Sequence, residues 1–332
     1  MIGLLEDVGI EAMTATASQN RVPVEAVLKD LMPPKKARRL ARGTGIDALS
    51  LAPPDVCTSD LCFESASRLL AEIDRDEIGA LVFISQTADY LSPATSYCLQ
   101  KRLGLVQDIL AFDVNLGCSG FCYGIFLAGT LLPALGGRKV LLLCGDTSSR
   151  NASPDASAML SIAGDAGAAA IVAPQTDNAL YYHMESFGEM ADYPRIADEN
   201  GLALHEGNYV AMDGMGVMNF TIDEVPRNIH ALLDFARVDC AVLDRVLLHQ
   251  ANAMMVRTLA SKIGVAEDKA PFMSSQIGNT SSASIPVCLA EMARTGQYAG
   301  GKFLLSGFGV GMSIASLLMD FSQVRVLGTC DL

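Results

Sequence analysis

The sequence contains no tryptophan, and aromatic residues make up only 6% of its 332 residues. It also has no apolar run that approaches the roughly 20 residues needed to span a bilayer. Residues 1–10 lack the basic segment that opens a secretory signal peptide and carry Glu6 and Asp7 instead. Together these absences predict a cytoplasmic protein that does not enter a membrane.

Positive charge is scarce, since 24 Lys and Arg residues stand against 37 Asp and Glu, for a formal net charge of −13 at pH 7. This balance argues against a general nucleic-acid-binding protein, whose surface must be basic. The nine cysteines are odd in number and form no CxxC pair. Neither Cys57/Cys62 nor Cys118/Cys122 has the His or further Cys neighbours of a zinc site. We therefore expect free thiols in a reducing compartment and no bound metal.

The sequence is rich in apolar segments, with 50% hydrophobic residues, which is enough for a large core. Runs typical of strands alternate with runs of helical periodicity. The expected strands cover 8–14, 80–85, 109–114, 139–144, 164–172, 246–248, 303–306 and 316–321. The expected helices cover 22–31, 60–73, 93–103, 121–128, 226–237, 253–263 and 284–293. This alternation predicts an α/β sheet.

The two halves of the chain repeat one another in order and approximate spacing. LVFISQT (81–87) and RVLLHQA (245–251) are both strands followed by Gln, and VLLLCGD and FLLSGFG are both strands followed by Gly. NLGCSGFCYGIFLA and IGNTSSASIPVCLA are both turns that lead into helices of small residues. We interpret the pattern as a duplication. It predicts an N-terminal half at 1–172, an insertion or cap region at 173–220, and a C-terminal half at 221–332.

Three polar residues stand at the ends of expected elements, where ligand sites collect in α/β folds. Cys118 precedes a helix, and the helix dipole there is expected to favour thiolate over thiol and to lower the pKa of the cysteine. His249 ends a strand, and Asn279 lies in the turn GNTSS. Each residue alone is more often structural, so the argument depends on their combination. The remaining histidines have no comparable context and are interpreted as structural: His183, His205 and His230.

The segments LGCSGF, LLHQAN, IGNTSSASIP and GFGVG occur in this order and at separations that resemble the β-ketoacyl-acyl-carrier-protein synthase III group of the thiolase superfamily. The resemblance covers nearly the whole chain. It implies a thiolase-like fold, in which two duplicated α/β halves form a layered αβαβα core, and a homodimer. Related condensing enzymes with two histidines are disfavoured because Asn279 occupies the second position. Thiolases proper are disfavoured because the late glycine motif lacks their second catalytic cysteine.

The resemblance implies that Cys118 is the acylated nucleophile and that His249 and Asn279 complete a catalytic triad. It places an oxyanion hole at the backbone N–H groups of Cys118 and Val310. The implied reaction is acyl transfer to Cys118, followed by decarboxylative Claisen condensation with a malonyl thioester. The substrates would be acyl-coenzyme A or acyl-carrier protein and malonyl-carrier protein, with no cofactor. The pathway would be fatty-acid, surface-polysaccharide or secondary-metabolite biosynthesis.

One basic cluster stands out in this acidic chain, and we expect it to bind the phosphate-bearing donor or an acidic acyl carrier protein. A charge run is more often a solvated helix face, so this alternative stays open. The cluster consists of Lys35, Lys36, Arg38, Arg39 and Arg42. Arg257, in the helix after His249, is a further candidate contact for the carrier. The family's typical synthase clamps the adenine of coenzyme A with a Trp and an Arg, and because Trp is absent here the choice between coenzyme A and carrier protein is left open.

An acyltransferase that moves the acyl group from Cys118 to a hydroxyl or amine, without condensation, would share the same triad and stays open. A cysteine hydrolase is disfavoured, because Leu116 stands where the nucleophile elbow needs Gly. A silent partner subunit is disfavoured because the triad is intact. A dinucleotide-binding enzyme is disfavoured because Gly307-x-Gly309-x-Gly311 has the wrong spacing.

Overall fold

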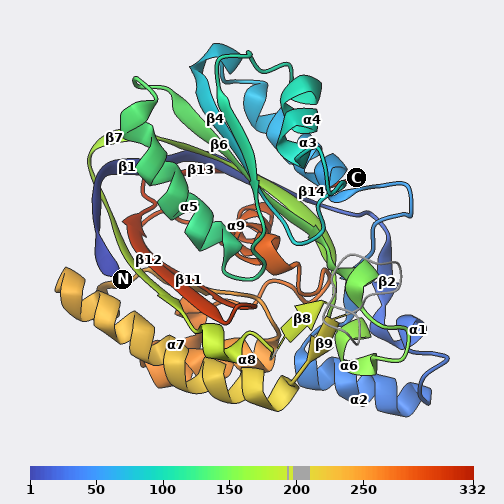
Figure 1. Cartoon of the computed structure of the whole chain (residues 1–332). Coiled ribbons are helices and arrows are strands. Elements are labelled where there is room, and N and C mark those ends of the chain that lie inside the picture. The colour runs from blue at the N-terminus through green and yellow to red at the C-terminus, as the bar shows by residue number, and fades with distance from the viewer. Residues whose placement is uncertain (193, 197–209) are drawn as a thin grey trace.

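The computed structural model describes residues 1–192, 194–196 and 210–332 (Figure 1). Within these residues the main sheet has 10 strands, with the order β10-β11-β12-β7-β6-β4-β5 and with β1 beside β7. The long strands are β1 (Ile2–Ala17), β4 (Ile78–Ile84), β5 (Leu110–Val114), β6 (Lys139–Thr147), β7 (Asp165–Ser186), β10 (Arg245–Leu248), β11 (Lys302–Gly309) and β12 (Ser313–Asp320). The short strands are β2 (Arg21–Pro23), β3 (Ala48–Ser50), β8 (Pro194–Ile196), β9 (Val210–Met212), β13 (Arg325–Val326) and β14 (Cys330–Asp331).

Helices separate and cover the two ends of this sheet (Figure 1). In the middle, α5 (Gly120–Leu131) and α9 (Ser284–Arg294) lie between the strands around β4 and β6 and those around β10 to β12. The outer helices are α3 (Thr58–Leu70) and α4 (Thr95–Leu103) on one face, and α7 (Gly214–Ala236) and α8 (Ala253–Ile263) on the other. The three remaining α-helices are α1 (Val24–Val27), α2 (Pro34–Thr44) and α6 (Ser157–Leu160). The order helix, sheet, helix, sheet, helix confirms the layered αβαβα core that the sequence predicts.

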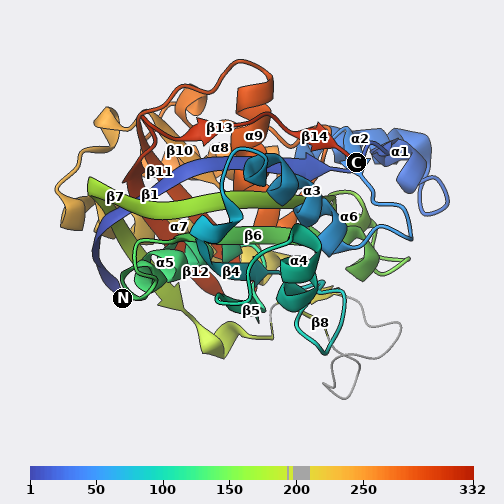
Figure 2. The ribbon, with the colours of Figure 1, turned by 90° about the horizontal axis from the view of Figure 1, so that it is seen from above.

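The two sheet regions share one pairing pattern. β4 is parallel to β6, which is antiparallel to β7, and β10 is parallel to β11, which is antiparallel to β12. This repeat agrees with the internal similarity of the sequence. β1 and β7 run side by side across both regions (Figure 2), because β7 pairs first with β6 and later with β12. The domain limits at 172 and 220 stay a prediction, and β7 passes through the first of them.

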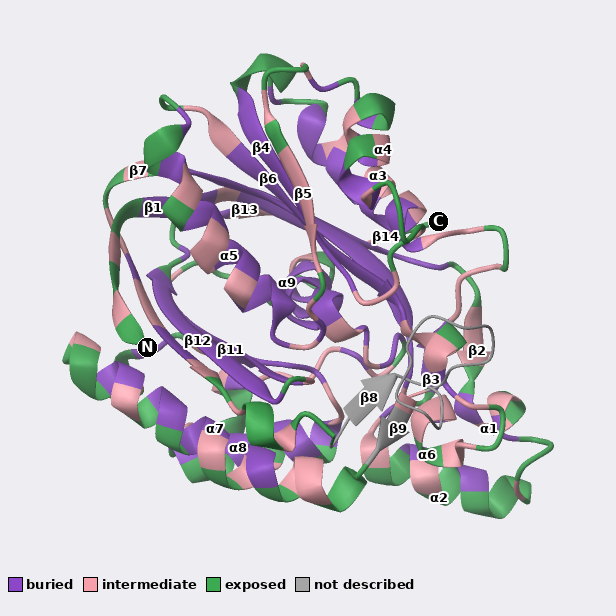
Figure 3. Cartoon of the chain, in the orientation of Figure 1, coloured by how far each residue is buried: buried purple, intermediate pink, exposed green. Residues whose placement is uncertain are grey.

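The core lies on both sides of the central helices, which explains why their sequences are apolar or small all round. All seven residues of β4 are buried, and α9 is buried from Ser284 through Met292 (Figure 3). Gly124 lets α5 approach the sheet closely, since a Cβ there would lie 2.6 Å from Leu142 and 2.7 Å from Ile84. The outer helices expose their polar faces to solvent, as amphipathic helices do.

Several expected elements differ in length from the structure. The strand expected at 8–14 covers Ile2–Ala17, and the helix expected at 22–31 covers only Val24–Val27. The helix expected at 226–237 begins already at Gly214, where Asp213 caps it by accepting hydrogen bonds from the N–H groups of Met215 and Gly216. Pro226 lies inside this helix, although proline favours the first turn and therefore suggested a start. The strand expected at 164–172 continues to Ser186. None of the helices in the described part of the chain combines the length and hydropathy that crossing a bilayer requires.

Candidate active site

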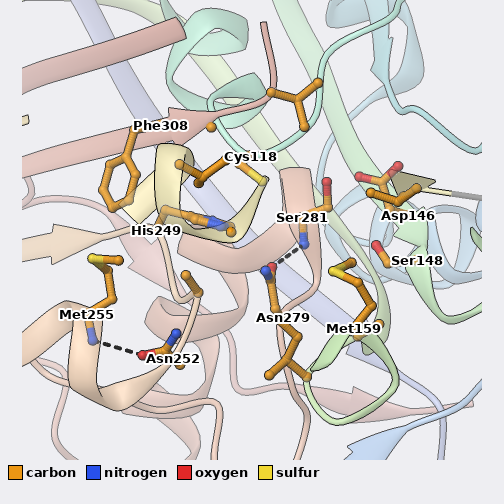
Figure 4. Close-up of a pocket in the computed structure, with 18 of the residues that line it drawn as sticks. Cys118, Asp146, Ser148, Met159, His249, Asn252, Met255, Asn279, Ser281 and Phe308 are labelled. Atoms are coloured by element: carbon orange, nitrogen blue, oxygen red, sulfur yellow. Dashed lines mark hydrogen bonds between the residues drawn. The ribbon is translucent and has the colours of Figure 1, made fainter. Parts of the chain in front are cut away.

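A cavity of about 270 Å³ lies where the two halves of the molecule meet (Figure 4). Its lining includes Cys118 from the start of α5, His249 from the end of β10 and Asn279 from the turn before α9. The fold therefore brings Cys118 together with His249 and Asn279, which follow it by more than a hundred positions. Each lies at the end of an element, as the sequence pattern predicts.

Cys118 lies against the glycine-rich segment at the end of β11. A Cβ on Gly309 would be 2.8 Å from the Cβ of Cys118 and 3.1 Å from its Sγ, and Gly309 has a φ of +150°. A Cβ on Gly307 would lie 2.8 Å from the Cα of Ser119. Only glycine fits this close approach, so the GFGVG motif is a requirement of packing around the cysteine.

Two backbone N–H groups, those of Val310 and of Cys118 itself, lie close enough to the cysteine sulfur to lower its pKa. The loop that carries Val310 is held by hydroxyls, because the Ser313 hydroxyl lies 2.8 Å from that of Ser119 and donates to the Val310 carbonyl at 3.1 Å. A carbonyl oxygen attached to this sulfur would lie near both N–H groups. The arrangement has the features of an oxyanion hole.

The expectation of a lowered cysteine pKa is wrong for this site. Burial raises the pKa of Cys118 to about 11, and the nearby Asp146 carboxylate adds to the rise. Hydrogen bonds from Ser281, from Val310 and from the N–H of Cys118 act in the opposite direction but do not outweigh these effects. Cys118 precedes Ser119, the cap residue of α5. The resting group at neutral pH is therefore the thiol, and a base is needed to form the thiolate.

His249 supplies a neutral imidazole, and only 3% of its surface is exposed. Burial lowers its pKa to about 3, so the ring is uncharged at neutral pH. Its Nδ1 lies 2.6 Å from the Ser284 hydroxyl, and Phe308 packs edge-on against the ring with centroids 5.5 Å apart. Because Ser284 engages Nδ1, Nε2 is the nitrogen left for the cavity. A neutral imidazole there can accept a proton or donate a hydrogen bond.

Asn279 is fixed through both its backbone and its side chain. Its N–H donates to the Ile162 carbonyl at 2.7 Å, and its own carbonyl accepts from the N–H of Gly164 at 2.9 Å. A Cβ on Gly164 would lie 2.0 Å from the Ile277 carbonyl oxygen, so the two loops can cross only at a glycine. The side-chain Oδ1 accepts from the N–H of Ser281 at 3.0 Å. With Oδ1 engaged, the amide NH₂ is the group free to donate into the cavity.

Asp146 is a site residue that the sequence reasoning missed. It is 1% exposed at the end of β6, and Figure 4 shows the side chain of Ser281 between Asp146 and Cys118. Burial raises the pKa of Asp146, while the hydrogen bonds it accepts lower it. These bonds come from the Ser85 and Thr87 hydroxyls, the Gln86 N–H, and the N–H and hydroxyl of Ser282, at 2.7–3.2 Å. The sequence signal was a buried strand that ends in Gly-Asp.

The basic residues separate into two groups. Lys36 and Arg39 line a second cavity of about 590 Å³ on the surface between α2 and the start of α8, and it shares Asn252 and Met254 with the first. Arg38 instead pairs with Glu25 at 3.0 Å. The structure places Lys35, Arg42 and Arg257 at exposed positions that line neither cavity.

The other sequence predictions around the site concern histidine, cysteine and metal. His183 and His230 bond to the carbonyls of Asn228 and Ile263, as structural histidines do, and His205 lies outside the described residues. All nine cysteines are free. Across 1–192, 194–196 and 210–332, no group of three His, Cys, Asp or Glu residues could hold a metal ion.

Comparisons with known proteins agree with the geometry. The family model for 3-oxoacyl-(acyl-carrier-protein) synthase III matches residues 112–188, and the model for its C-terminal part matches residues 233–321. A curated relative, the beta-ketoacyl-(acyl-carrier-protein) synthase III of Rhodopirellula baltica, is 32% identical over 309 residues, which cover 84% of this chain and 89% of the relative. A putative 3-oxoacyl-(acyl-carrier-protein) synthase 3 of Campylobacter jejuni is 28% identical, and the match covers 87% of this chain and 86% of that relative.

A solved structure extends the similarity to the whole fold. The 3-oxoacyl-(acyl-carrier protein) synthase of Burkholderia xenovorans superposes with a TM-score of 0.94 at 28% identity, covering 100% of this chain and 99% of that one. The superposition confirms the thiolase-like fold that the motifs imply.

Proposed function

Because the chain belongs to the 3-oxoacyl-(acyl-carrier-protein) synthase III family, we propose that it catalyses a decarboxylative condensation in which Cys118 carries the acyl group. His249 and Asn279 assist the condensation step. The observation that carries this proposal is the convergence of a thiol, a neutral imidazole and an oriented amide on one cavity. Such a set suits chemistry in which negative charge develops on a substrate oxygen.

In the first half-reaction, the thiol of Cys118 gives its proton to Nε2 of His249 as the sulfur attacks the acyl thioester. The N–H groups of Cys118 and Val310 stabilise the tetrahedral oxyanion. The carbon–sulfur bond of the donor then breaks, and the departing thiolate takes the proton from His249. Because the pKa of Cys118 is raised to about 11 and that of His249 is lowered to about 3, the proton moves only as the sulfur attacks and is not held by His249 in the resting site.

In the second half-reaction, a malonyl thioester loses CO₂ and becomes an enolate. Its oxygen accepts hydrogen bonds from Nε2–H of His249 and from the NH₂ of Asn279. The enolate carbon attacks the acyl carbonyl, and the bond to the Cys118 sulfur breaks. The Ser284 hydroxyl can donate to Nδ1 or accept from it, so it supports both tautomers of His249 that the two steps need.

The test compares the two half-reactions in Asn279→Ala. Labelling of Cys118 by an acyl donor, followed by intact-mass measurement, should proceed near the wild-type rate. Release of CO₂ from malonyl thioester should fall about 10²–10³-fold, because one donor to the enolate is lost. Equal losses in both steps would make Asn279 structural, and labelling that persists in Cys118→Ala would refute the nucleophile.

Further features support proposals about partners. Lys36 and Arg39 at the second cavity support a phosphate-bearing donor, either coenzyme A or an acyl carrier protein, that enters past Asn252 and Met254. The nine free cysteines support a cytoplasmic location. The outer edge of β5 has no partner strand among the described residues, and apolar side chains lie around it, which supports a homodimer. No observation specifically favours the acyltransferase without condensation.

A further inference from the structure

The active-site cavity has two ends of different character. One end reaches Asn252 and Met254, which it shares with the basic surface cavity. Figure 4 places Asn252 and Met255 on this side, beyond His249. The other end lies on the side of Asp146 and Ser148. If a phosphate-bearing donor enters at the basic end, the acyl group that it delivers to Cys118 extends toward the other.

We call the end of the cavity near Asp146 and Ser148 the acyl end. Polar side chains form part of its wall. The side chains of Gln86, Ser148 and Asn151 line the cavity, and none of the three bonds to another residue in the described part of the chain. Ser148 and Asn151 begin and end one 3₁₀ turn, and side chains three apart in such a turn eclipse one another and face the same way. The N–H of Gln86 is held by Asp146 at 2.8 Å. Two amide side chains and a hydroxyl thus line this cavity.

Apolar side chains line the same cavity, among them those of Met159 and Ile162, and Figure 4 shows Met159 on the same side as Ser148. No Lys or Arg residue of the described chain lines this cavity, and the one carboxylate there, Asp146, is occupied by its five hydrogen bonds. A carboxylate on the substrate would meet the negative charge of Asp146 without a cation to balance it. A plain alkyl chain would leave the amides and the hydroxyl without partners.

We propose that the acyl end of the cavity selects a short, uncharged acyl group that carries a hydroxyl, such as a 3-hydroxyacyl group. A hydroxyl both donates and accepts, as do the side chains of Gln86, Ser148 and Asn151, so any of the three can pair with it. The carbon chain would lie along Met159 and Ile162. This inference rests on the proposed acylation of Cys118, and it makes the three polar residues determinants of specificity. Sites that hydrogen-bond a substrate hydroxyl reject the analogue that lacks it more strongly than apolar pockets separate chain lengths.

The experiment measures how fast Cys118 is labelled by matched pairs of thioesters. Butanoyl and each enantiomer of 3-hydroxybutanoyl are offered as coenzyme A thioesters and, in parallel, on acyl carrier protein, and the adduct is followed by intact mass. Wild type should take one 3-hydroxybutanoyl enantiomer at least tenfold faster than butanoyl. Succinyl-coenzyme A, which is similar in size but anionic, should label most slowly.

Variants separate the polar wall from the rest of the site. The double variant Ser148→Ala/Asn151→Ala should lower the hydroxybutanoyl-to-butanoyl ratio about tenfold, and Gln86→Met tests the same wall from β4 if the double variant does not fold. Ser153→Ala is the matched control, because Ser153 follows the same turn but does not line the cavity. Its ratio should equal that of wild type.

The outcomes distinguish the proposed preference for a hydroxyacyl group from the proposed acylation of Cys118. If wild type takes butanoyl as fast as both hydroxybutanoyl enantiomers, or if the wall variants keep the wild-type ratio, the hydroxyacyl preference is refuted while Cys118 stands as nucleophile. If no thioester labels Cys118 on either carrier, the proposed function is refuted and this inference with it. A faster reaction with succinyl would refute the claim that the acyl group is uncharged.

Discussion

The reactive groups are each held by a partner that occupies one polar atom and leaves the other for substrate. Ser284 engages Nδ1 of His249, and the N–H of Ser281 engages Oδ1 of Asn279. Neither partner carries charge, so the orientation is set without adding a field that would oppose a developing enolate. Side chains fixed in this way lose little freedom when substrate binds, which is the physical content of preorganisation.

Burial of His249 predicts a pH-dependent stability. The pKa of His249 is about 3 in the folded chain, below its usual value of 6.5, so the unfolded state binds the proton more tightly. The stability that His249 contributes is present above pH 6.5 and is lost as the pH falls toward 3, at up to about 1.4 kcal/mol per pH unit. His249→Gln should remove this part of the slope when urea unfolding is measured at pH 7, 5 and 4.

A His249→Gln variant that loses unfolding free energy as steeply as wild type between pH 6.5 and 4 would contradict the burial effect.

The convergence of Cys118, His249 and Asn279 on one cavity could be predicted from the sequence, while the protonation state of the cysteine could not. Cys118, His249 and Asn279 each stand in a short motif of consecutive residues, and such a motif can be recognised without knowledge of the fold. The raised pKa of Cys118 depends on Asp146 and on burial, and both are created by segments that meet only in the folded chain. The roles of Gln86, Ser148 and Asn151 were hidden for the same reason.

At the scale of elements, α2 carries the basic cluster, but only part of its surface faces the cavity. Lys36→Glu/Arg39→Glu should raise the KM for the acyl donor roughly tenfold or more, and the defect should shrink at high salt. Lys35→Glu/Arg42→Glu makes the same change of charge on residues outside the cavity and should have a much smaller effect. Equal KM values for the two double variants would mean that binding of the acyl donor depends on the net charge of α2 and not on the position of Lys36 and Arg39.

A second element, the strap of residues 322–332, covers one edge of β1 through β13 and β14. Leu327 donates its N–H to the Met13 carbonyl at 2.9 Å, and Arg68 donates to the Gly328 carbonyl at 2.8 Å. Deleting the strap after Phe321 should lower the free energy of unfolding by on the order of 2–4 kcal/mol, since several hydrogen bonds are lost together. It should also promote aggregation through the bared edge, as measured by light scattering.

The control for the strap is Arg325→Gln, which removes one exposed ion pair with Glu72. It should cost less than about 1 kcal/mol. A strap deletion that costs no more than this variant would show that the edge pairing does not stabilise the fold.

Elements of regular length could be predicted from the sequence, and short ones could not. The helix expected at 253–263 has the bounds of α8, because apolar positions at helical spacing lie between Asn252 and Gly264, which cap it. β13 and β14 have two residues each and no periodicity of their own, so only pairing with β1 defines them. The sequence prediction placed the start of α7 at Pro226, because proline is common in the first turn of a helix, whereas the helix begins at Gly214.

At the scale of the whole molecule, we expect a dimer built across β5. This strand ends the sheet order, and among the described residues its outer edge has no partner. Large apolar side chains lie exposed on β5 and on the α4 segment before it: Leu110 at 47%, Tyr97 at 55%, Tyr90 at 58% and Leu91 at 77%. An open edge beside such a patch is typical of a surface that a second copy covers.

Light scattering should therefore give twice the mass of the 35.1 kDa chain at micromolar concentration. Leu110→Lys should give the monomer mass, whereas Leu4→Lys, at an exposed position on β1, should leave the dimer intact. A wild-type monomer would contradict the proposal.

The position of β1 also has a consequence for how the protein is made. One edge of β1 pairs with β7, and the other pairs with β13 and β14. Thr16 thus lies beside Cys330, which follows it by 314 residues. While the chain leaves the ribosome, one edge of this 16-residue strand has no partner until β7 has been synthesised, and the other edge has none until the last residues have been synthesised. An unpaired strand edge can pair with other chains and cause aggregation. The yield in a cell should therefore depend on chaperones that shield residues 2–17 until synthesis is complete.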